Sequence, residues 1–470
     1  MTTQVLAPPK TSADSGGART AILPWWSIAA YPVLWLLGLA FFFWPLLLLR
    51  VALVRRPRRI PPLLLGAVPL LLALSMALAV ALGETEPGRA LSAVYNILIW
   101  EVVVVALSMR WSVGDLRQLV RGIVALASTQ GVVVFVAIWS YPTGAGFTPL
   151  ITKILPASLL RDPSTQSFLV DNLAFADYYG GSVLRSSGFF GHPNWGAGLA
   201  GMATILAIAS VMQSLRSGFR RLLLLRLTQV VMCAVPLQYS YSRTTVVAVV
   251  LALTVGVAVQ VSTVASRRTW MTGIGALTAA AAAAATQVNW THAYNKFNEP
   301  RLGSLLSRSE IYRQTWHVIV HHPVTVLGVG TKERVTGLAA SLGTHSTYLG
   351  MIYRAGWLAA LSLAGFLLLV LWTAARRGQW LAAALVSFVA LWSLAEDFDV
   401  GHLLPLGLLL SCLLVNLCPH PKRTDFGQNA GSRVRWILGD VLTEHSTPDG
   451  YLPEMAPAGP HWIVHKAPKR

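Results

Sequence analysis

The sequence has 470 residues, of which 54% are hydrophobic and only 12% are charged, and its mean hydropathy is +0.57. A soluble domain usually carries about 25% charged residues, so this composition excludes an ordinary soluble protein. The net charge is +18, from 37 Lys and Arg against 19 Asp and Glu. Much of this charge lies in short loops and tails, where the positive-inside bias and anionic lipid headgroups explain it without nucleic acid.

Apolar runs of about 20 residues, long enough to cross a bilayer as helices, recur along the chain. They predict an all-α, polytopic transmembrane helix bundle, with basic loops inside and a large extracytoplasmic loop. Eleven spans follow from the pattern: 27–53, 62–82, 90–109, a fourth ending near 141, 195–212, a sixth ending at 239, a seventh beginning at 244, 270–287, 346–372, a tenth ending at 396, and 402–418.

The first apolar run, 22–54, leaves the number of spans open. It contains prolines at 24, 32 and 45. As one span it gives a total of eleven and an outside N-terminus. As two short, proline-broken half-spans it gives twelve and an inside N-terminus, which is the interpretation we prefer.

Three regions follow from this topology. A polar N-terminal segment covers 1–21, and the membrane domain covers 22–418, with long outside loops at 142–193 and 288–345. The basic C-terminal tail, 419–470, is predicted to lie inside and to be poorly ordered.

Three arginines stand beside serines at the ends of predicted spans on the outside: Arg185, Arg243 and Arg308. The planar guanidinium binds phosphate oxygens through paired hydrogen bonds and stays charged at any working pH. Outside arginines also pair with acidic residues or extend to headgroups. Because three share one setting, we favour binding of a lipid-linked diphosphate.

The stretch 301–357 separates two apolar runs and contains six Lys or Arg and four His. Its part 307–322 predicts an amphipathic helix ended by Pro323, followed by a Gly328-x-Gly330 motif that we assign to turn geometry alone. His345 stands where the loop re-enters the membrane. A neutral histidine there is able to take a proton from a sugar hydroxyl; the equal alternative is a histidine that caps the next span or hydrogen-bonds a neighbour.

Asp397 and Asp399 have the Asp-x-Asp spacing that can hold Mg²⁺ or Mn²⁺. The spacing supplies few of the six ligands that Mg²⁺ requires, so we favour carboxylates that position the arginines. The three cysteines lie in or at the end of apolar runs without a CxxC motif, which predicts neither a disulfide framework nor a zinc site. We therefore expect no metal and no cofactor.

Several of these motifs, in this order, resemble the O-antigen ligase and Wzy-type polymerase superfamily. The resemblance covers about 184–410 and is carried by the stretch 188–197 (GFFGHPNWGA), by Ser242-Arg243, by the run from Ser307 through Gly330 to His345, and by Asp397-Phe398. The chain departs from the family where His-Asn is replaced by His345-Ser346, and its first span resembles that of actinobacterial members.

The resemblance implies a GT-C-like membrane glycosyltransferase in the bacterial cytoplasmic membrane. Such an enzyme moves a glycan from an undecaprenyl-diphosphate-type carrier to a glycolipid or polymer acceptor at the outer face, without metal and with inversion. Carried over by motif, Arg185, Arg243 and Arg308 would bind the diphosphate, and His345 would activate the acceptor hydroxyl.

Two other functions compete with a ligase. A polymerase would extend a lipid-linked glycan instead of transferring it to a different acceptor. A transporter of an anionic lipid or solute should carry charged residues within its spans and paired repeats. Glu101 is the one residue of that kind that stands out, and no repeat is apparent.

Overall fold

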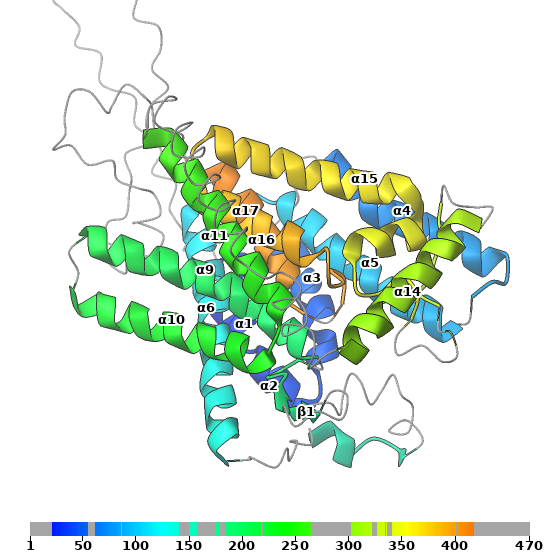
Figure 1. The fold of residues 1–470 in the computed structure, drawn as a ribbon, viewed down its shortest axis with the longest axis horizontal. Helices are drawn as coiled ribbons and strands as arrows, with labels where there is room; N and C mark the ends of the chain where they lie inside the picture. The colour runs from blue at the N-terminus through cyan, green and yellow to red at the C-terminus, as the bar shows by residue number, and fades with distance from the viewer. Residues whose placement is uncertain are drawn as a thin grey trace, which may run out of the picture.

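The structure is a computed structural model, and it describes residues 21–54, 62–85, 87–140, 150–157, 175–177, 184–190, 192–217, 220–264, 302–321, 327–333, 335, 341–400 and 402–417. The described part is a bundle of helices with one two-stranded sheet (Figure 1). This confirms the all-α fold class. The predicted span 270–287 and the tail 419–470 lie outside the described residues.

Seven described helices are long and apolar enough to cross a membrane, which identifies a multi-pass membrane protein. These helices are α4 (Leu63–Ala81), α5 (Pro87–Leu107), α6 (Val113–Ser140), α9 (Pro193–Ser217), α10 (Arg220–Ser240), α11 (Arg243–Val264) and α15 (Thr347–Arg376). Four shorter apolar helical segments accompany them, at Trp25–Leu37, Ala40–Val54, Trp380–Trp392 and Leu404–Leu417.

The first apolar run is broken into two helical segments. The first segment consists of α1 (Trp25–Ala29) and α2 (Tyr31–Leu37) and ends at Gly38, which has φ 77°. The second consists of η1 (Ala40–Phe42) and α3 (Phe43–Val54). The break was predicted at the prolines but lies at this glycine. Pro24, Pro32 and Pro45 instead sit at or within the first turn of a helix, where a missing N–H costs nothing.

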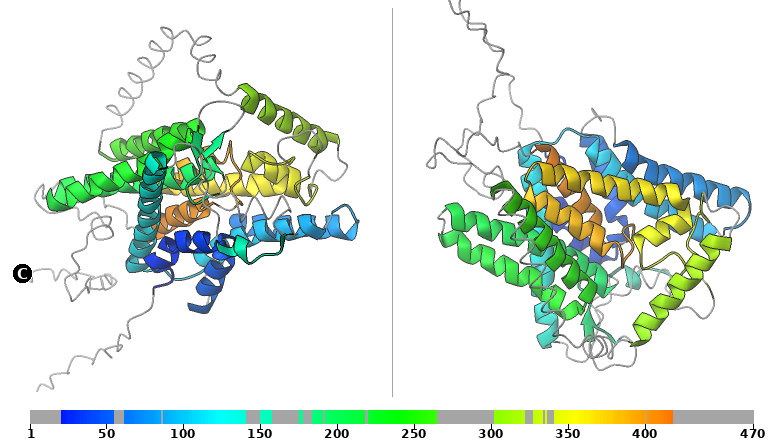
Figure 2. Two further views of the ribbon diagram at one scale, coloured as in Figure 1. Left: turned by 90° about the horizontal axis from the view of Figure 1, so that it is seen from below. Right: turned by 45° about the horizontal axis from the view of Figure 1, so that its top comes forward.

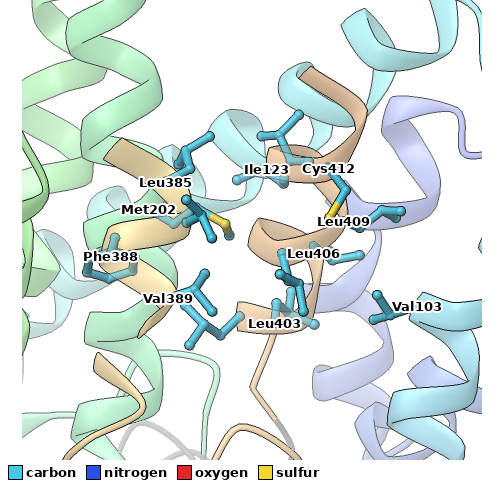
Figure 3. Packing of buried hydrophobic residues seen from close by; sticks show 14 of the residues in the cluster. Val103, Ile123, Met202, Leu385, Phe388, Val389, Leu403, Leu406, Leu409 and Cys412 are labelled. Atoms are coloured by element: carbon cyan, nitrogen blue, oxygen red, sulfur yellow. The ribbon is translucent and has the colours of Figure 1, made fainter. Parts of the chain in front are cut away.

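Two short helices, α16 (Trp380–Trp392) and α17 (Leu404–Leu417), form the centre of the bundle. Eleven of the 13 residues of α16 and 12 of the 14 of α17 are buried, so protein rather than lipid encloses them. Met202, Val389 and Leu406 meet in this core (Figure 3). The described residues between the two helices, 393–400 and 402–403, are thereby anchored at both sides by buried helices.

Helix α15 is bent at Gly356, whose φ of 76° and ψ of 177° are essentially confined to glycine. The bend leaves the carbonyls of Tyr353 and Arg354 without their usual partners in the helix. The amides of Val329 and Gly330 donate to these two carbonyls at 2.8 and 2.9 Å. The turn that contains Val329 and Gly330 is thus attached to the bent part of α15.

Helix α14 (Leu302–His321) lies at the edge of the bundle, close to the bent end of α15 (Figures 1 and 2). The only sheet in the described residues is the antiparallel pair β1 (Phe175–Asp177) and β2 (Leu184–Ser186), in which Ala176 faces Arg185. Strand β2 contacts α10. Strand β2 and helix α14 thus represent the two long polar segments of the sequence among the described residues.

Candidate active site

Arg185, on β2, is buried and held by two oxygen acceptors. Its Nε donates to the carbonyl of Ser240 at 2.7 Å, and one terminal nitrogen donates to Oδ1 of Asn194 at 2.8 Å. Ser240 is the last residue of α10, and Asn194 lies in the first turn of α9. Arg185 therefore connects two helix ends with its guanidinium.

Arg243 is the first residue of α11, directly after the tight turn that follows α10. The turn is fixed by Tyr241 in the left-handed region, with φ 49°, and by a 2.8 Å hydrogen bond between the hydroxyls of Ser242 and Thr245. Trp392 donates its indole N–H to that Thr245 hydroxyl at 3.1 Å. The turn thus places Arg243 three residues from the carbonyl that Arg185 contacts, next to the end of α16.

Arg308, on α14, pairs with Glu396, which follows α16. One terminal nitrogen of Arg308 lies 2.8 Å from Oε1 of Glu396, and the other donates to the carbonyl of Ala395 at 3.2 Å. The same Oε1 accepts from the side-chain amide of Asn194. A continuous chain of hydrogen bonds therefore runs from Arg185 through Asn194 and Glu396 to Arg308.

The backbone around His345 is anchored to both α14 and the segment after α16. His345 has φ 63°, in the left-handed region, and its carbonyl accepts from the hydroxyl of Tyr312 at 2.5 Å. Thr347 donates its amide to the carbonyls of Ser393 and Glu396 at 2.9 and 3.1 Å. His345 thus lies against the same segment as Arg308.

Ser346, not His345, caps helix α15. Its hydroxyl accepts a hydrogen bond from the amide of Leu349, as an N-cap residue does. The alternative of a capping role for His345 is therefore wrong. Ser346 therefore caps the helix at the position where the family that the motifs resemble carries asparagine.

The pKa of His345 is lowered from its ordinary value of 6.5. Burial lowers it most; Glu396 and Asp397 raise it, and Arg308 and Lys332 lower it further. A histidine with a lowered pKa is neutral near pH 7, which is the form that accepts a proton.

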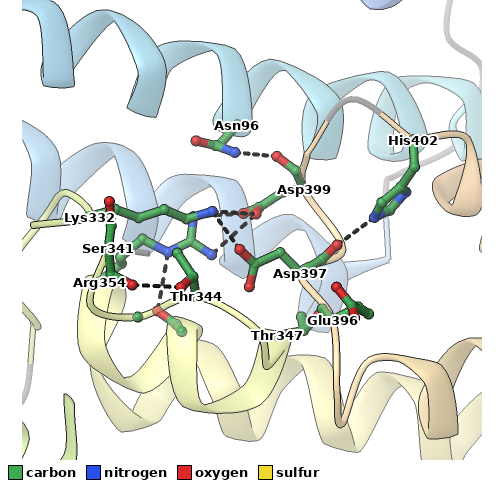
Figure 4. Close-up of polar contacts among 12 residues, drawn as sticks. Asn96, Lys332, Ser341, Thr344, Thr347, Arg354, Glu396, Asp397, Asp399 and His402 are labelled. Carbon is green, nitrogen blue, oxygen red and sulfur yellow. Dashed lines mark hydrogen bonds and ion pairs between the residues drawn. The ribbon is translucent and has the colours of Figure 1, made fainter. Parts of the chain in front are cut away.

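A second group of charges lies beside the first (Figure 4). Arg354 of α15 forms two hydrogen bonds with Asp399, at 2.8 and 3.2 Å, and both side chains are almost fully buried. The indole N–H of Trp100 donates to the same carboxylate at 3.1 Å. Burial raises the pKa of Asp399, but Arg354 and Lys332 outweigh it and the net shift is downward.

Lys332 lies 2.8 Å from Oδ2 of Asp397 and 4.0 Å from Oδ1 of Asp399. Both carboxylates therefore contact cations in the described structure, as we expected for carboxylates that position basic side chains. The cations that contact them are Lys332 and Arg354. The carboxylate that contacts a predicted arginine is Glu396. The described residues contain no group of three His, Cys, Asp or Glu side chains that could hold a metal ion.

One carboxylate oxygen of Asp397 has no partner among the described residues. Its side chain is only 8% exposed, and Oδ1 is buried without a hydrogen bond from any described residue, while Oδ2 contacts Lys332. A buried carboxylate oxygen normally has a donor. The backbone of Asp397 is held in place because its carbonyl contacts the imidazole of His402.

The Gly328-x-Gly330 motif forms a tight turn, as predicted. Gly328 and Gly330 have φ values of 74° and 81°. A Cβ atom on Gly328 would lie 2.5 Å from the backbone carbon of Arg354, and one on Gly330 would lie 2.7 Å from the carbonyl oxygen of Ser75. The turn lets the backbone approach α15 and α4, and it brings Lys332 to the carboxylates.

Helix α14 has one buried face, with Ile311, Thr315 and Ile319, as its pattern predicted. Arg313 is 69% exposed, but the apolar Trp316 is exposed as well, at 47%. Trp316 packs edge to face against Trp357, just after the bend in α15, with ring centroids 6.2 Å apart. The helix ends at His321, in agreement with a stop before Pro323.

Residues 228–364 match the O-antigen ligase family. The match confirms the resemblance seen in the motifs, and it includes Arg243, Arg308 and His345 but not Arg185 or Glu396. No curated protein matches the chain.

Proposed function

We propose that this chain, which carries an O-antigen ligase family domain at residues 228–364, transfers a glycan from a polyprenyl-diphosphate carrier to a glycolipid or cell-envelope polymer at the outer face of the bacterial cytoplasmic membrane. The observation that carries the proposal is the charge balance of the site. Three cations (Arg308, Lys332 and Arg354) pair with three carboxylates (Glu396, Asp397 and Asp399), and Arg185 on β2 and Arg243 at the start of α11 add two positive charges, so these eight groups have a net charge of +2.

A diphosphate suits such a site because it is anionic and because arginine binds its oxygens through two parallel hydrogen bonds. Arg185 on β2 and Arg308 on α14 are connected through Asn194 and Glu396, and Arg243 begins α11 three residues after the carbonyl that Arg185 contacts. In this proposal the three arginines hold the diphosphate and stabilise the negative charge that grows on it as it leaves. The arginines supply that stabilisation, so the reaction needs no metal ion.

His345 acts as the general base in this proposal. Its imidazole takes the proton from an acceptor hydroxyl, and the oxygen attacks the anomeric carbon of the donor sugar. The new C–O bond forms as the bond from that carbon to the diphosphate oxygen breaks, and polyprenyl diphosphate leaves. A single displacement of this kind inverts the anomeric configuration.

The unpaired oxygen of Asp397 offers the acceptor a second attachment. Oδ1 lacks a described donor, and Asp397 is close enough to His345 to raise its pKa. A sugar hydroxyl next to the reacting one would satisfy this oxygen. We assign Asp397 to acceptor binding.

Replacement of Arg308 tests the proposal. Arg308→Ala should abolish transfer from undecaprenyl-diphosphate-linked oligosaccharide while the protein still inserts and purifies. Arg308→Lys keeps the charge but loses the planar guanidinium that makes paired hydrogen bonds. Activity of this variant close to wild type would refute paired phosphate contacts. Arg313→Ala is the control, because Arg313 lies on the same helix, is 69% exposed and pairs with Glu310 away from the site.

Two further measurements refine the proposal. The product separates the two activities of the family, because a ligase makes one transfer to a different acceptor and a polymerase makes a ladder of extended lipid-linked glycans. EDTA should leave turnover unchanged. Inhibition that Mg²⁺ or Mn²⁺ reverses would refute the metal-independent mechanism and point to Asp397 and Asp399.

A further inference from the structure

The backbone of Lys332 is fastened to three neighbouring parts of the bundle. Two residues earlier, the amide of Gly330 donates to helix α15 at 2.9 Å. The hydroxyl of Thr331 lies 2.7 Å from that of Thr85, in the turn between α4 and α5. The carbonyl of Lys332 itself accepts from a terminal nitrogen of Arg89, on α5, at 3.3 Å. Lys332 therefore projects its side chain from a fixed backbone position.

The side chain of Lys332 reaches two carboxylates (Figure 4). Its Nζ lies 2.8 Å from Oδ2 of Asp397 and 4.0 Å from Oδ1 of Asp399. The side chains of Lys332 and Asp397 are 18% and 8% exposed, and that of Asp399 is fully buried. Solvent screens such an ion pair much less than a pair on the surface. The contact with Asp397 is therefore strong enough to hold both groups in place.

The two carboxylates differ in how much they depend on Lys332. Asp399 accepts two hydrogen bonds from Arg354 and one from the indole of Trp100. The carboxylate of Asp397 has Lys332 on Oδ2, and its buried Oδ1 has no donor among the described residues. If the ammonium of Lys332 were removed, Asp399 would keep its three bonds. No described side chain would then hold the carboxylate of Asp397.

The ion pair also determines how the carboxylate of Asp397 is turned. The last torsion of an aspartate side chain is broad and roughly two-fold, so an unheld carboxylate has no single orientation. Because Lys332 holds Oδ2, the direction of Oδ1 is set as well. An ionised carboxylate only accepts hydrogen bonds, so a group that binds Oδ1 must be a donor. A sugar hydroxyl is such a donor, whereas an anionic group is repelled.

We propose that Lys332 is a positioning residue for the acceptor: it orients the carboxylate of Asp397 so that Oδ1 accepts a hydrogen bond from an uncharged, hydroxyl-bearing sugar. This inference rests on the proposed function, in which Asp397 binds the acceptor. It gives Lys332 a role different from that of the arginines. The charge of Lys332 acts on a carboxylate of the protein, and the arginines act on the diphosphate of the donor.

The test is transfer by the purified full chain, with undecaprenyl-diphosphate-linked oligosaccharide at saturation and a cell-envelope glycolipid fraction varied as acceptor. Lys332→Met removes the ammonium and keeps an unbranched side chain, and Lys332→Arg keeps the positive charge. Asp397→Asn and the double variant Lys332→Met/Asp397→Asn complete a cycle. Lys153→Met is the matched control, because Lys153 is an exposed lysine on η2 (Leu150–Lys153). Binding of undecaprenyl diphosphate in phosphatidylcholine nanodiscs and the melting temperature are measured for each variant.

We expect Lys332→Met to raise the apparent KM for the acceptor about tenfold, the worth of one hydrogen bond to a charged group. Its affinity for undecaprenyl diphosphate should stay within about twofold of wild type, because the arginines are unchanged. Lys332→Arg should restore most of the acceptor affinity, and Lys153→Met should behave like wild type. The double variant should be no worse than Asp397→Asn alone, since Lys332 acts through Asp397.

Three results would overturn the inference. The first is a wild-type acceptor KM in Lys332→Met. The second is weaker binding of undecaprenyl diphosphate by Lys332→Met with an unchanged acceptor KM, since Lys332 would then hold the donor. The third is a double variant with an acceptor KM several times above that of Asp397→Asn. This comparison still decides if Lys332→Met unfolds because Asp397 is left unpaired, since the double variant removes both charges.

The same measurements distinguish the inference from the proposal on which it rests. If wild type transfers no glycan and binds no undecaprenyl diphosphate, the proposed function fails and the inference fails with it. If wild type is active but neither Asp397→Asn nor Lys332→Met changes the acceptor KM, Asp397 does not bind the acceptor. If Asp397→Asn raises the acceptor KM and Lys332→Met does not, only the role of Lys332 is refuted.

Discussion

Glu396 connects the arginines of the site, and its replacement tests whether that connection matters. The change is Glu396→Gln, which keeps the shape of the side chain and an oxygen to accept from Asn194 but removes the charge. Arg308 then loses its ion pair at 2.8 Å, while its bond to the carbonyl of Ala395 is not touched by the change. We expect Arg308 to leave its position and transfer to fall.

The magnitude follows from the burial of the pair. Glu396 is 3% exposed and Arg308 is 23% exposed, so solvent screens the interaction only in part. A hydrogen bond to a charged group contributes about 1.5–3 kcal/mol, and this partial screening favours the lower end. At about 1.4 kcal/mol per tenfold, kcat/KM should fall roughly tenfold to thirtyfold.

The assay compares Glu396→Gln with wild type in transfer from undecaprenyl-diphosphate-linked oligosaccharide and in binding of undecaprenyl diphosphate. Glu310→Gln is the matched control, since Glu310 is an exposed carboxylate that pairs with Arg313 on the same helix as Arg308. It should behave like wild type. Tighter binding of undecaprenyl diphosphate and undiminished transfer by Glu396→Gln would refute the reasoning, because Glu396 would then compete with the substrate for Arg308.

Three further predictions concern single residues. Gly356→Ala should destabilise the protein by about 1–3 kcal/mol, because its backbone conformation excludes a side chain; Gly365→Ala, on the same helix with its nearest neighbour at 3.9 Å, should leave the melting temperature unchanged or higher. The lowered pKa of His345 predicts that kcat/KM falls to half its plateau only below pH 6.5, as the base becomes protonated; a half-loss above pH 6.5 would contradict its role. Asp397→Asn should raise KM for the acceptor about tenfold, with donor binding little changed, and an equal loss of donor affinity would argue against acceptor binding.

The helical elements followed from the sequence because apolar runs of sufficient length have few alternatives in a bilayer. The course of the first apolar run did not follow from the sequence. Its prolines fit the beginnings of helices, and Gly38 makes the break, since a glycine adopts a φ of 77° at little cost. Proline marks a helix start as readily as a kink, and the sequence alone does not separate the two.

The site was predictable only in part. Arg185, Arg243 and Arg308 stood out because each is a charge at the end of an apolar run. Their connecting residues did not stand out, because they come from distant segments: Glu396 lies 88 residues from Arg308 and 202 from Asn194. No local pattern reports such pairing. The Asp-x-Asp spacing of Asp397 and Asp399 favoured carboxylates that position arginines over a metal site, but it did not predict which cations they contact, which are Lys332 and Arg354.

The central claim is that this site transfers a glycan and releases polyprenyl diphosphate. The most direct measurement is release of undecaprenyl diphosphate from undecaprenyl-diphosphate-linked oligosaccharide by the purified chain, with a cell-envelope glycolipid fraction as acceptor. Wild type should release it only when acceptor is present, and His345→Ala should bind the donor normally but release none. Release by His345→Ala at the wild-type rate, or no release by wild type while the donor is carried across liposome membranes, would contradict the account.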